Sequence, residues 1–368
     1  MTAIRRVKPA IAVESLRAAG MRKKVGLALQ GGGSWGAFTW GVLDVLLASR
    51  NVAIAQLTGT SAGAINAAIV AGALAQSSPA EARRRLRSFW LAIAKPRAAD
   101  LGRAVWGPFE RQWRETIGAW LVSSGSFSPY TANPLGLNPL RDAIAEHVDI
   151  EAIRSAHAPA LYVTVTNVRS GLPRVITNRT MTIDALLASA CLPQLFQAVE
   201  IDGEPYWDGG YSGNPTLWPM IQDGHARDLI VVQLSPEAVK TVPTDAHAIQ
   251  RRVDQIVFHS SLVAEMQSIQ TMRGLAAGSS NVLDLRIHRI GPPSAELFDA
   301  GSALERSRAW IERLHAEGRR SARRFLGKHG QDIGVRETLD IDNVFLDRRS
   351  ETVGSMTAEV GPSHLAAA

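Results

Sequence analysis

The sequence predicts an α/β fold with a mostly parallel central sheet covered by helices. Two successive strand, turn and helix units predict it. In the first, a buried strand over 25–29 leads through the glycine turn 31–33 into a helix over 36–47. In the second, a strand over 52–57 leads through the turn 59–63 into an alanine-rich helix over 64–74. Repeated units of this kind indicate parallel strands with helices on the faces of the sheet.

The later elements continue the same alternation. Asn138-Pro139 is a typical helix start, and the helix is expected to run to about His147. We then expect a strand over 161–168, a capped helix over 182–191, a hairpin-like turn over 199–203, a strand over 229–234, a helix over 246–272, a strand over 282–287 and a helix over 303–325.

The bulk composition narrows the class of protein. Of 368 residues, 46% are hydrophobic, which is ample for a buried core. The 40 basic and 34 acidic residues leave a charge of +6, with basic clusters near the start and over 306–328. Neither cluster is followed by paired Cys/His ligands or interleaved aromatics, so we expect no nucleic-acid binding and favour contact with an anionic membrane.

Cysteine content and hydropathy predict the compartment. Cys191 is the single cysteine, which excludes an intrachain disulfide and a zinc cluster of thiolates. The N-terminus has no apolar run of signal-peptide length before Val25, and the long apolar stretch 62–75 is interrupted by Asn66. We therefore expect a soluble, cytoplasmic protein that contacts the membrane only peripherally.

The strongest chemical signal is Gly59-Thr-Ser61-Ala-Gly63, which fits G-x-S-x-G between a strand and a helix. A nucleophilic serine needs such a turn, because small neighbours let the backbone fold back and expose the hydroxyl beside the helix N-terminus. The pattern predicts Ser61 as a nucleophile, with Gly59 and Gly63 supporting the turn. The alternative is an ordinary Ser-Gly loop.

The glycine turn Gly31-Gly-Gly-Ser34-Trp-Gly36 admits two interpretations. It fits the dinucleotide fingerprint G-x-G-x-x-G, but no Asp or Glu occurs between Asp44 and Glu81 to bind a ribose. The same residues fit an oxyanion hole, in which the backbone N–H groups of Gly31, Gly32, Gly33 and Ser34 face a developing alkoxide. The nearby serine turn favours this second interpretation, with Gly36 opening the helix.

A nucleophilic serine also needs a base. The usual base is histidine, and of nine histidines His288, at the end of a strand, is the best placed. Asp208 is the other candidate, because Gly209 and Gly210 let its turn approach another loop closely. In a dry site the pKa of a carboxylate rises toward the range where it can accept the serine proton.

Together and in this order, Gly31-Gly-Gly-Ser-Trp-Gly36, Gly59-Thr-Ser-Ala-Gly63 and Asp208-Gly-Gly210 resemble the patatin-like phospholipase family. The similarity covers roughly residues 24–234. It implies a three-layer α/β/α fold and a serine lipid-acyl hydrolase with a Ser61–Asp208 dyad, a glycine-rich oxyanion hole, an acyl-lipid substrate and no metal or cofactor. Trp35 departs from the pattern, because many relatives carry a basic residue there.

These observations predict the organisation of the chain. We expect a basic extension over 1–23, a catalytic domain over 24–300 with a helical Trp/Arg-rich insertion at about 81–134, a basic helix over 301–330 and a tail over 331–368. The tryptophans from Trp90 to Trp120 suit either a lid that contacts lipid or helix packing. Two other functions stay open: a Ser-His-Asp esterase or acyltransferase, and a non-catalytic lipid-binding protein of the same fold.

Overall fold

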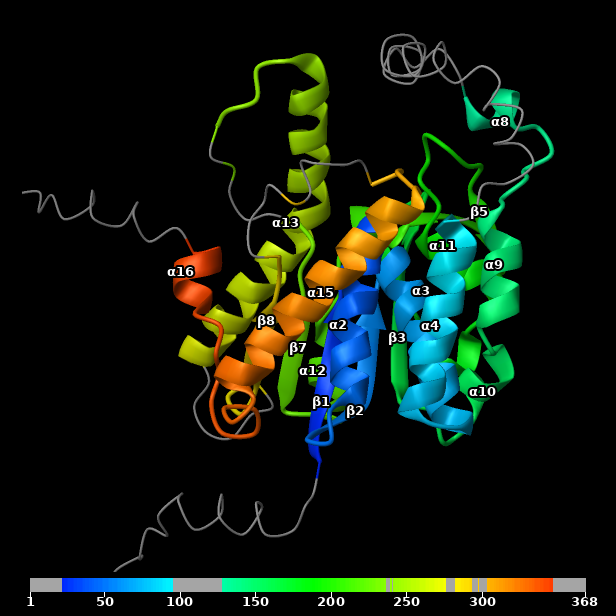
Figure 1. The fold of residues 1–368 in the computed structure, drawn as a ribbon. Helices are drawn as coiled ribbons and strands as arrows, with labels where there is room; N and C mark the ends of the chain where they lie inside the picture. The colour runs from blue at the N-terminus through cyan, green and yellow to red at the C-terminus, as the bar shows by residue number, and fades with distance from the viewer. Residues whose placement is uncertain are drawn as a thin grey trace, which may run out of the picture.

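The computed structural model describes residues 22–94, 128–235, 239, 241–275, 282–292, 297 and 303–346. Within them eight strands form one sheet in the order β5-β6-β3-β2-β1-β7-β8, with β4 paired to β3 (Figure 1). The strands are β1 (Lys23–Leu29), β2 (Val52–Gly59), β3 (Ala160–Asn167), β4 (Pro173–Thr177), β5 (Val199–Ile201), β6 (Glu204–Asp208), β7 (Asp228–Val232) and β8 (Arg286–Ile290).

The strands β3, β2, β1, β7 and β8 run parallel. Strands β4 and β6 pair antiparallel with β3, and β5 pairs antiparallel with β6. The α-helices are α2 (Gly36–Ala48), α3 (Ala62–Gln76), α4 (Pro79–Ala94), α8 (Pro129–Ala132), α9 (Leu140–His147), α10 (Ile150–Arg154), α11 (Ile183–Ser189), α12 (Trp218–Asp223), α13 (Ala246–Leu275), α15 (Arg308–His329) and α16 (Ile341–Phe345). Short 3₁₀ helices are η1 (Gly33–Trp35), η3 (Asn178–Thr180) and η4 (Gly209–Tyr211).

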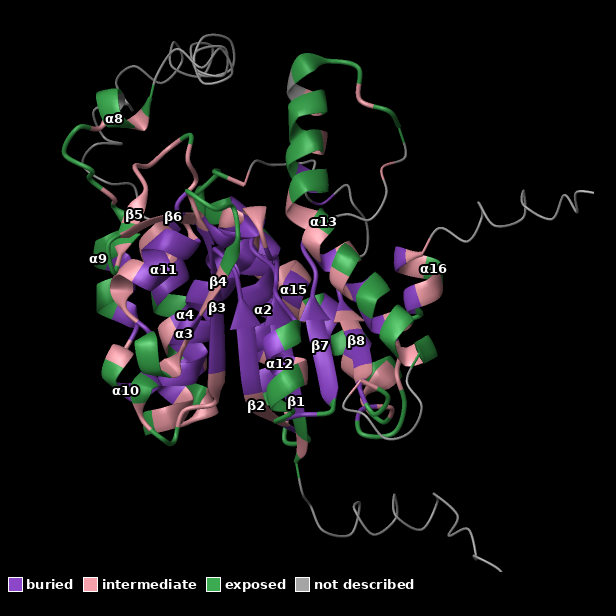
Figure 2. Cartoon of the chain, turned by 180° about the vertical axis from the view of Figure 1, so that it is seen from behind, coloured by how far each residue is buried: buried purple, intermediate pink, exposed green. Residues whose placement is uncertain are grey.

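Alternation along the strands divides the core into two layers. In β7, Ile230 and Val232 pack with α2, α3, α4 and α15, whereas Leu229 and Val231 face α12, α13 and α16. Successive side chains of a strand point to opposite faces, so each face of the sheet carries its own helical layer. The predicted three-layer α/β/α fold with a mostly parallel sheet is confirmed, and Figure 2 shows the buried sheet between the layers.

Helix α15 packs directly along α2. Gly41 and Gly318 lie at the crossing, where a Cβ on either residue would overlap the backbone of the other helix. Trp40 stacks on His315 with ring centroids 3.7 Å apart. The C-terminal part of the chain is therefore joined to the helix that begins directly after the glycine turn.

An ion cluster centred on Asp44 fastens the same contact. Asp44 accepts a hydrogen bond from Arg83 Nε of α4 at 2.6 Å, and His315 Nε2 and Arg319 Nε of α15 lie 3.6 and 3.4 Å from its carboxylate. Burial alone would raise the pKa of Asp44, but the partners His315, Arg83 and Arg319 hold it far below its usual range. One carboxylate thus links three helices.

Several elements begin or end at other residues than the sequence predicts. The strand expected over 282–287 begins at Arg286, because β8 pairs with β7 from Asp228 onward. The helix expected over 303–325 begins at Arg308, where the Ser307 hydroxyl accepts from Trp310 N and caps it, and continues to His329. Strand β4 was not predicted. No helix in the described residues has the length and apolar character needed to cross a bilayer.

The expected Trp/Arg-rich insertion lies mostly outside the described residues, which omit 95–127. Trp90 is an exception. It is buried in α4 and donates from Nε1 to Asn66 Oδ1 at 2.9 Å, while Asn66 Nδ2 donates to the carbonyl of Gly36. Trp90 is therefore a core residue and does not contact lipid.

Candidate functional site

The turn between β2 and α3 carries Ser61. This residue occupies the N-cap position of α3 with φ 55° and ψ −126°, a conformation that is rare for a residue with a side chain. Such backbone strain costs on the order of 1–3 kcal/mol and concentrates at functional sites. The Ser61 N–H donates to Ser189 Oγ at 2.9 Å, which holds the strained turn against α11.

The register of β3 brings Asp208 to this turn. Gly59, at the end of β2, pairs with Val163 of β3, and Asp208, at the end of β6, pairs with Val165. Strand β6 therefore continues along the same edge of β3 where β2 stops. Ser61, two residues beyond Gly59, and Asp208 consequently lie at one point, although 147 positions separate them in the sequence.

The Asp208 carboxyl group is fully buried. Its Oδ1 accepts a hydrogen bond from Gly210 N at 2.7 Å, whereas Oδ2 has no hydrogen-bond partner among the described residues. Burial raises the pKa of Asp208 to about 7, and the Gly210 N–H and the nearby Ser61 hydroxyl lower it only in part. This carboxylate is a weak base with one oxygen left for a further proton donor.

The glycine turn packs directly against the serine turn. A Cβ on Gly31 would lie 2.8 Å from Ser61 Cβ, so no larger residue fits there. The Gly31 N–H already donates to Asn214 Oδ1 at 2.6 Å, and the Ser34 N–H donates to the carbonyl of Ala303 at 2.7 Å. The N–H groups of Gly32 and Gly33 make no hydrogen bond within the described part of the chain, which leaves them as the available donors.

The supporting glycines named from the sequence have a steric reason. A Cβ at any of these positions would overlap a neighbouring atom that belongs to the site or to its walls. The glycines concerned are Gly36, Gly59, Gly63, Gly209 and Gly210. At Gly63 the neighbour is the carbonyl of Leu29, at the end of β1. The helix after Ser61 can therefore approach the sheet only because residue 63 is glycine.

Two buried amides that the sequence did not reveal support the glycine turn. Asn214 Nδ2 donates to the carbonyl of Phe258 at 2.9 Å while its Oδ1 holds Gly31. Gln30 Oε1 accepts from Leu234 N at 2.7 Å, and its Nε2 donates to the carbonyl of Asn214. A buried amide must be hydrogen-bonded, but its partners are distant in sequence, so no local pattern announces it.

Helix α13 holds the loop that follows Asp208. The Ser261 hydroxyl accepts from Asn214 N at 2.9 Å. One turn further, Glu265 accepts from Leu217 N and Trp218 N at 2.8 and 3.0 Å, and burial raises the pKa of its carboxyl to about 7. One face of α13 thus fixes both ends of the segment from Asn214 to Trp218.

The candidate histidine His288 lies in a different cluster. Its Nε2 is 3.1 Å from Asp228 Oδ1 and its Nδ1 is 2.9 Å from Thr338 Oγ1, so both ring nitrogens are engaged away from Ser61. Another histidine, His259 of α13, lies 3.4 Å from Gln30 Nε2 and has its pKa lowered to about 4, mainly by burial. No group of three His, Cys, Asp or Glu residues in the described ranges is arranged to hold a metal ion.

The model of the family described as patatin-like phospholipase matches residues 27–221, more than half of the 368 residues, and the match includes all three motifs. The chain belongs to the patatin-like phospholipase family. Membership implies lipid acyl hydrolase activity, since the family acts on acyl lipids.

Similarity to solved structures is weak, and curated proteins give no match. The crystal structure of VipD from Legionella pneumophila is similar over 84% of this chain and 67% of that chain, with 12% identity and a TM-score of 0.36. The patatin-like family match and the geometry around Ser61 therefore carry the functional argument.

Proposed function

We propose that this patatin-like protein hydrolyses carboxylic esters of phospholipids or other acyl lipids, with Ser61 as nucleophile and Asp208 as base. One observation carries the proposal: a strained serine at a helix N-terminus lies beside a fully buried carboxylate whose Oδ2 has no other partner. The pKa of about 7 supports the role of base, because the ionised form is available near neutral pH and still binds a proton well.

In the first half of the reaction, Ser61 Oγ forms a bond to the ester carbonyl carbon while its proton passes to Asp208. The carbonyl oxygen becomes an oxyanion, which we assign to the N–H groups of Gly32 and Gly33. Donors of this kind are each worth about 3 kcal/mol in the transition state. The intermediate then expels the alcohol, which takes the proton from Asp208, and an acyl group remains on Ser61.

In the second half, water replaces the alcohol. Asp208 accepts a proton from the water as its oxygen bonds to the acyl carbon, and a second oxyanion forms in the same place. When the bond to Ser61 Oγ breaks, the proton on Asp208 returns to Ser61 and the fatty acid leaves. These steps need neither a metal nor a cofactor, and they need no imidazole.

The Ser-His-Asp alternative receives less support from the same contacts. His288 would have to release Asp228 or Thr338 before it could hydrogen-bond to Ser61. Peripheral contact with an anionic membrane belongs to the proposal as well, since the chain carries +6 and its substrates are lipids.

The test is hydrolysis of a short p-nitrophenyl ester and of phospholipid vesicles by the wild type, Ser61→Ala and Asp208→Asn. We expect both variants to lose about 10⁴-fold or more in kcat, as when a nucleophile or base is removed. Two exposed substitutions of the same types, Ser268→Ala and Asp284→Asn, serve as matched controls and should retain full activity. Labelling by a fluorophosphonate should modify Ser61 alone.

Three outcomes would count against the proposal. Retained turnover in Ser61→Ala would exclude Ser61 as nucleophile. Loss of activity in His288→Ala, with Asp208→Asn still active, would transfer the role of base to a histidine. A folded wild type inert on both substrates would favour the non-catalytic lipid-binding function.

A further inference from the structure

The N-terminal half of α13 projects past the sheet at the edge where the strands β1 and β2 end (Figure 1). None of the described residues between 246 and 254 is buried, and Figure 2 shows these turns exposed. The first strongly buried position of the helix is Gln255. More than two turns of helix therefore stand clear of the core on the side of the molecule that carries Ser61.

This projecting half carries an apolar stripe. Ile249, Val253 and Ile256 are exposed by 44%, 46% and 52%, and their spacing of four and three residues places them on one face of the helix. Val253 and the core residue Leu262 are nine positions apart, about two and a half turns, so the stripe faces away from the core. Exposed aliphatic side chains in this pattern are typical of an interaction surface.

The same edge carries a second exposed apolar region beside α8. Tyr130, Leu135 and Leu137 are all exposed there. The Tyr130 hydroxyl accepts a hydrogen bond from Ala198 N, and Gln197 donates to the carbonyl of Asn133, so the region is joined to the segment that leads into β5. Apolar surface thus occurs on two separate elements at the edge where a lipid must reach Ser61.

We propose that this edge docks on an anionic phospholipid membrane, with the α13 stripe of Ile249, Val253 and Ile256 entering the acyl region. The inference rests on the proposed function, since the substrate is a lipid that must enter at this edge. Arg252 flanks the stripe and Arg251 is exposed on the same turns. Of the two aspartates there, Asp245 caps the helix start by accepting from Ala248 N, and Asp254 is exposed. Arginine stems extend along apolar surface while their guanidinium groups meet headgroup phosphates.

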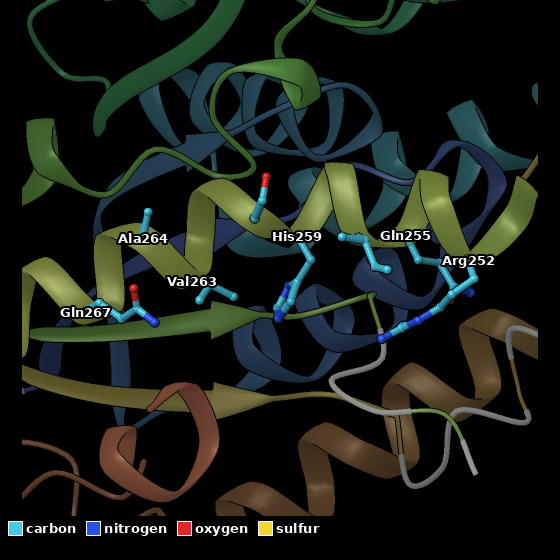
Figure 3. Close-up of a pocket in the computed structure, with 8 residues that line it drawn as sticks. Arg252, Gln255, His259, Val263, Ala264 and Gln267 are labelled. Carbon is cyan, nitrogen blue, oxygen red and sulfur yellow. The ribbon is translucent and has the colours of Figure 1, made fainter. Parts of the chain in front are cut away.

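A groove lies beside the stripe on α13. It has a volume of about 310 Å³ and runs along α13 from Arg252 to Gln267 (Figure 3). Its described lining includes Ile256 of the stripe and Val263, but neither Ser61 nor Asp208. His259, in the same lining, lies 3.4 Å from Gln30, the residue directly before the glycine turn. One residue of the groove therefore contacts Gln30, which precedes the glycine turn, while Ile256 belongs to the stripe.

The opposite side of α13 fixes the orientation of the docked protein. Phe258, Ser261 and Glu265 hold the segment from Asn214 to Trp218 through the hydrogen bonds described above. A helix that inserts one face into lipid while the other face holds the Asp208 loop keeps the site at the membrane surface. A second protein copy fits the stripe less well, because a stable dimer needs about 800 Å² per partner, far more than three half-exposed side chains offer.

The test compares the wild type with the triple variant Ile249→Ser, Val253→Ser and Ile256→Ser. Co-sedimentation uses vesicles of phosphatidylcholine and phosphatidylglycerol, and turnover is measured on the same vesicles and on a soluble p-nitrophenyl ester. We expect vesicle binding and vesicle hydrolysis to fall by about tenfold or more, because the removed side chains lose their transfer from water. Turnover of the soluble ester should stay within about twofold, because serine and β-branched residues have similar helix propensities.

A matched control removes apolar surface at the far end of the same helix. Met272→Ser with Leu275→Ser alters two other exposed side chains of α13 and should leave vesicle binding unchanged. If the triple variant unfolds, Val253→Glu alone provides the same comparison at a half-exposed position of the stripe. Circular dichroism and thermal unfolding establish that each variant is folded.

The outcomes separate docking from catalysis. Unchanged vesicle binding by the folded triple variant overturns the docking proposal, and so does a shift from dimer to monomer with unchanged vesicle binding. Equal losses in the triple variant and in the Met272/Leu275 control would also overturn it. If Ser61→Ala binds vesicles as the wild type does and the triple variant does not, docking stands even where the proposed hydrolysis fails.

Discussion

Ser189 Oγ accepts a hydrogen bond from the Ser61 N–H at 2.9 Å and donates its own proton to the carbonyl of Thr164 at 2.8 Å. Both serines are buried, and Ser189 is the last residue of α11. A hydroxyl from a distant helix thus holds the backbone of the strained residue to β3. This bond fixes where the nucleophile stands relative to the sheet.

Ser189→Ala should therefore lower kcat on the soluble ester by about tenfold and leave KM nearly unchanged. The substitution leaves the buried Ser61 N–H without a partner, which also costs about 1–3 kcal/mol of stability. Kinetics and thermal unfolding measure the two effects, with Ser268→Ala as the control. A variant with full kcat would show that the strained turn does not depend on this hydrogen bond.

Asn214 should act as a positioning residue for the glycine turn. Asn214→Ala removes the acceptor of the Gly31 N–H, so the neighbouring donors of Gly32 and Gly33 shift and kcat falls by about 10–100-fold. Asn214→Asp keeps that acceptor and should recover part of kcat, although it loses the donor to Phe258. Equal kcat values in the two variants would argue against a role in positioning and for a general effect on folding.

The rate of hydrolysis should follow the ionisation of Asp208. Because its pKa is about 7, kcat/KM on the soluble ester should rise about tenfold per pH unit below pH 7 and level off above pH 7. Glu265 has a pKa raised to a similar value, so the profile is repeated with Glu265→Gln. If the inflection vanishes in that variant, or if the wild-type profile is flat from pH 5 to 9, Asp208 is not the titrating base.

The same buried carboxylate should lower stability. Its pKa rises from an ordinary 3.8 to about 7 on folding, so the folded protein holds the proton more tightly and wild-type stability falls as pH rises between these values. Asp208→Asn keeps an acceptor for Gly210. At pH 8 its free energy of unfolding should be about 2–4 kcal/mol higher than that of the wild type. Denaturant titrations should show this gain shrinking toward zero as pH falls to 4.

Asp44 should behave in the opposite sense. Its partners depress its pKa, so its contribution to stability is present above pH 3.8 and is lost as pH falls further. Asp44→Asn leaves Arg83 and Arg319 without a counter-charge and should cost about 1–2 kcal/mol at pH 7, a value reduced because these arginines are partly exposed. Thermal unfolding checks it, and Asp284→Asn, in an exposed pair with Arg227, should change little.

The candidate site residues that the sequence suggests are those whose signal is local. Ser61 and the glycine turn each follow a buried strand and open a helix, and both requirements are legible within a dozen residues. The two glycines that follow Asp208 are a local signal of the same kind. The family match covers all three motifs.

What the sequence did not reveal depends on partners far along the chain. Asn214 accepts a hydrogen bond from Gly31, 183 positions away, and Gln30 accepts one from Leu234, 204 positions away. Neither contact can be predicted from neighbouring residues. The start of β8 at Arg286 follows from pairing with Asp228, and Trp90 is buried because Asn66 reaches it from the neighbouring helix. Strand register and buried hydrogen bonds of this kind are properties of the assembled sheet.

The place of β1 in the sheet has a practical consequence for expressing shorter pieces of this protein. The family match ends at residue 221, before β7, yet β1 pairs with β7 along one side and α15 covers α2. A fragment cut at that boundary would turn a central strand into an open edge, with unpaired N–H and C=O groups beside uncovered apolar surface. Such edges recruit other chains and aggregate, so we expect soluble truncations to retain the sequence through α16.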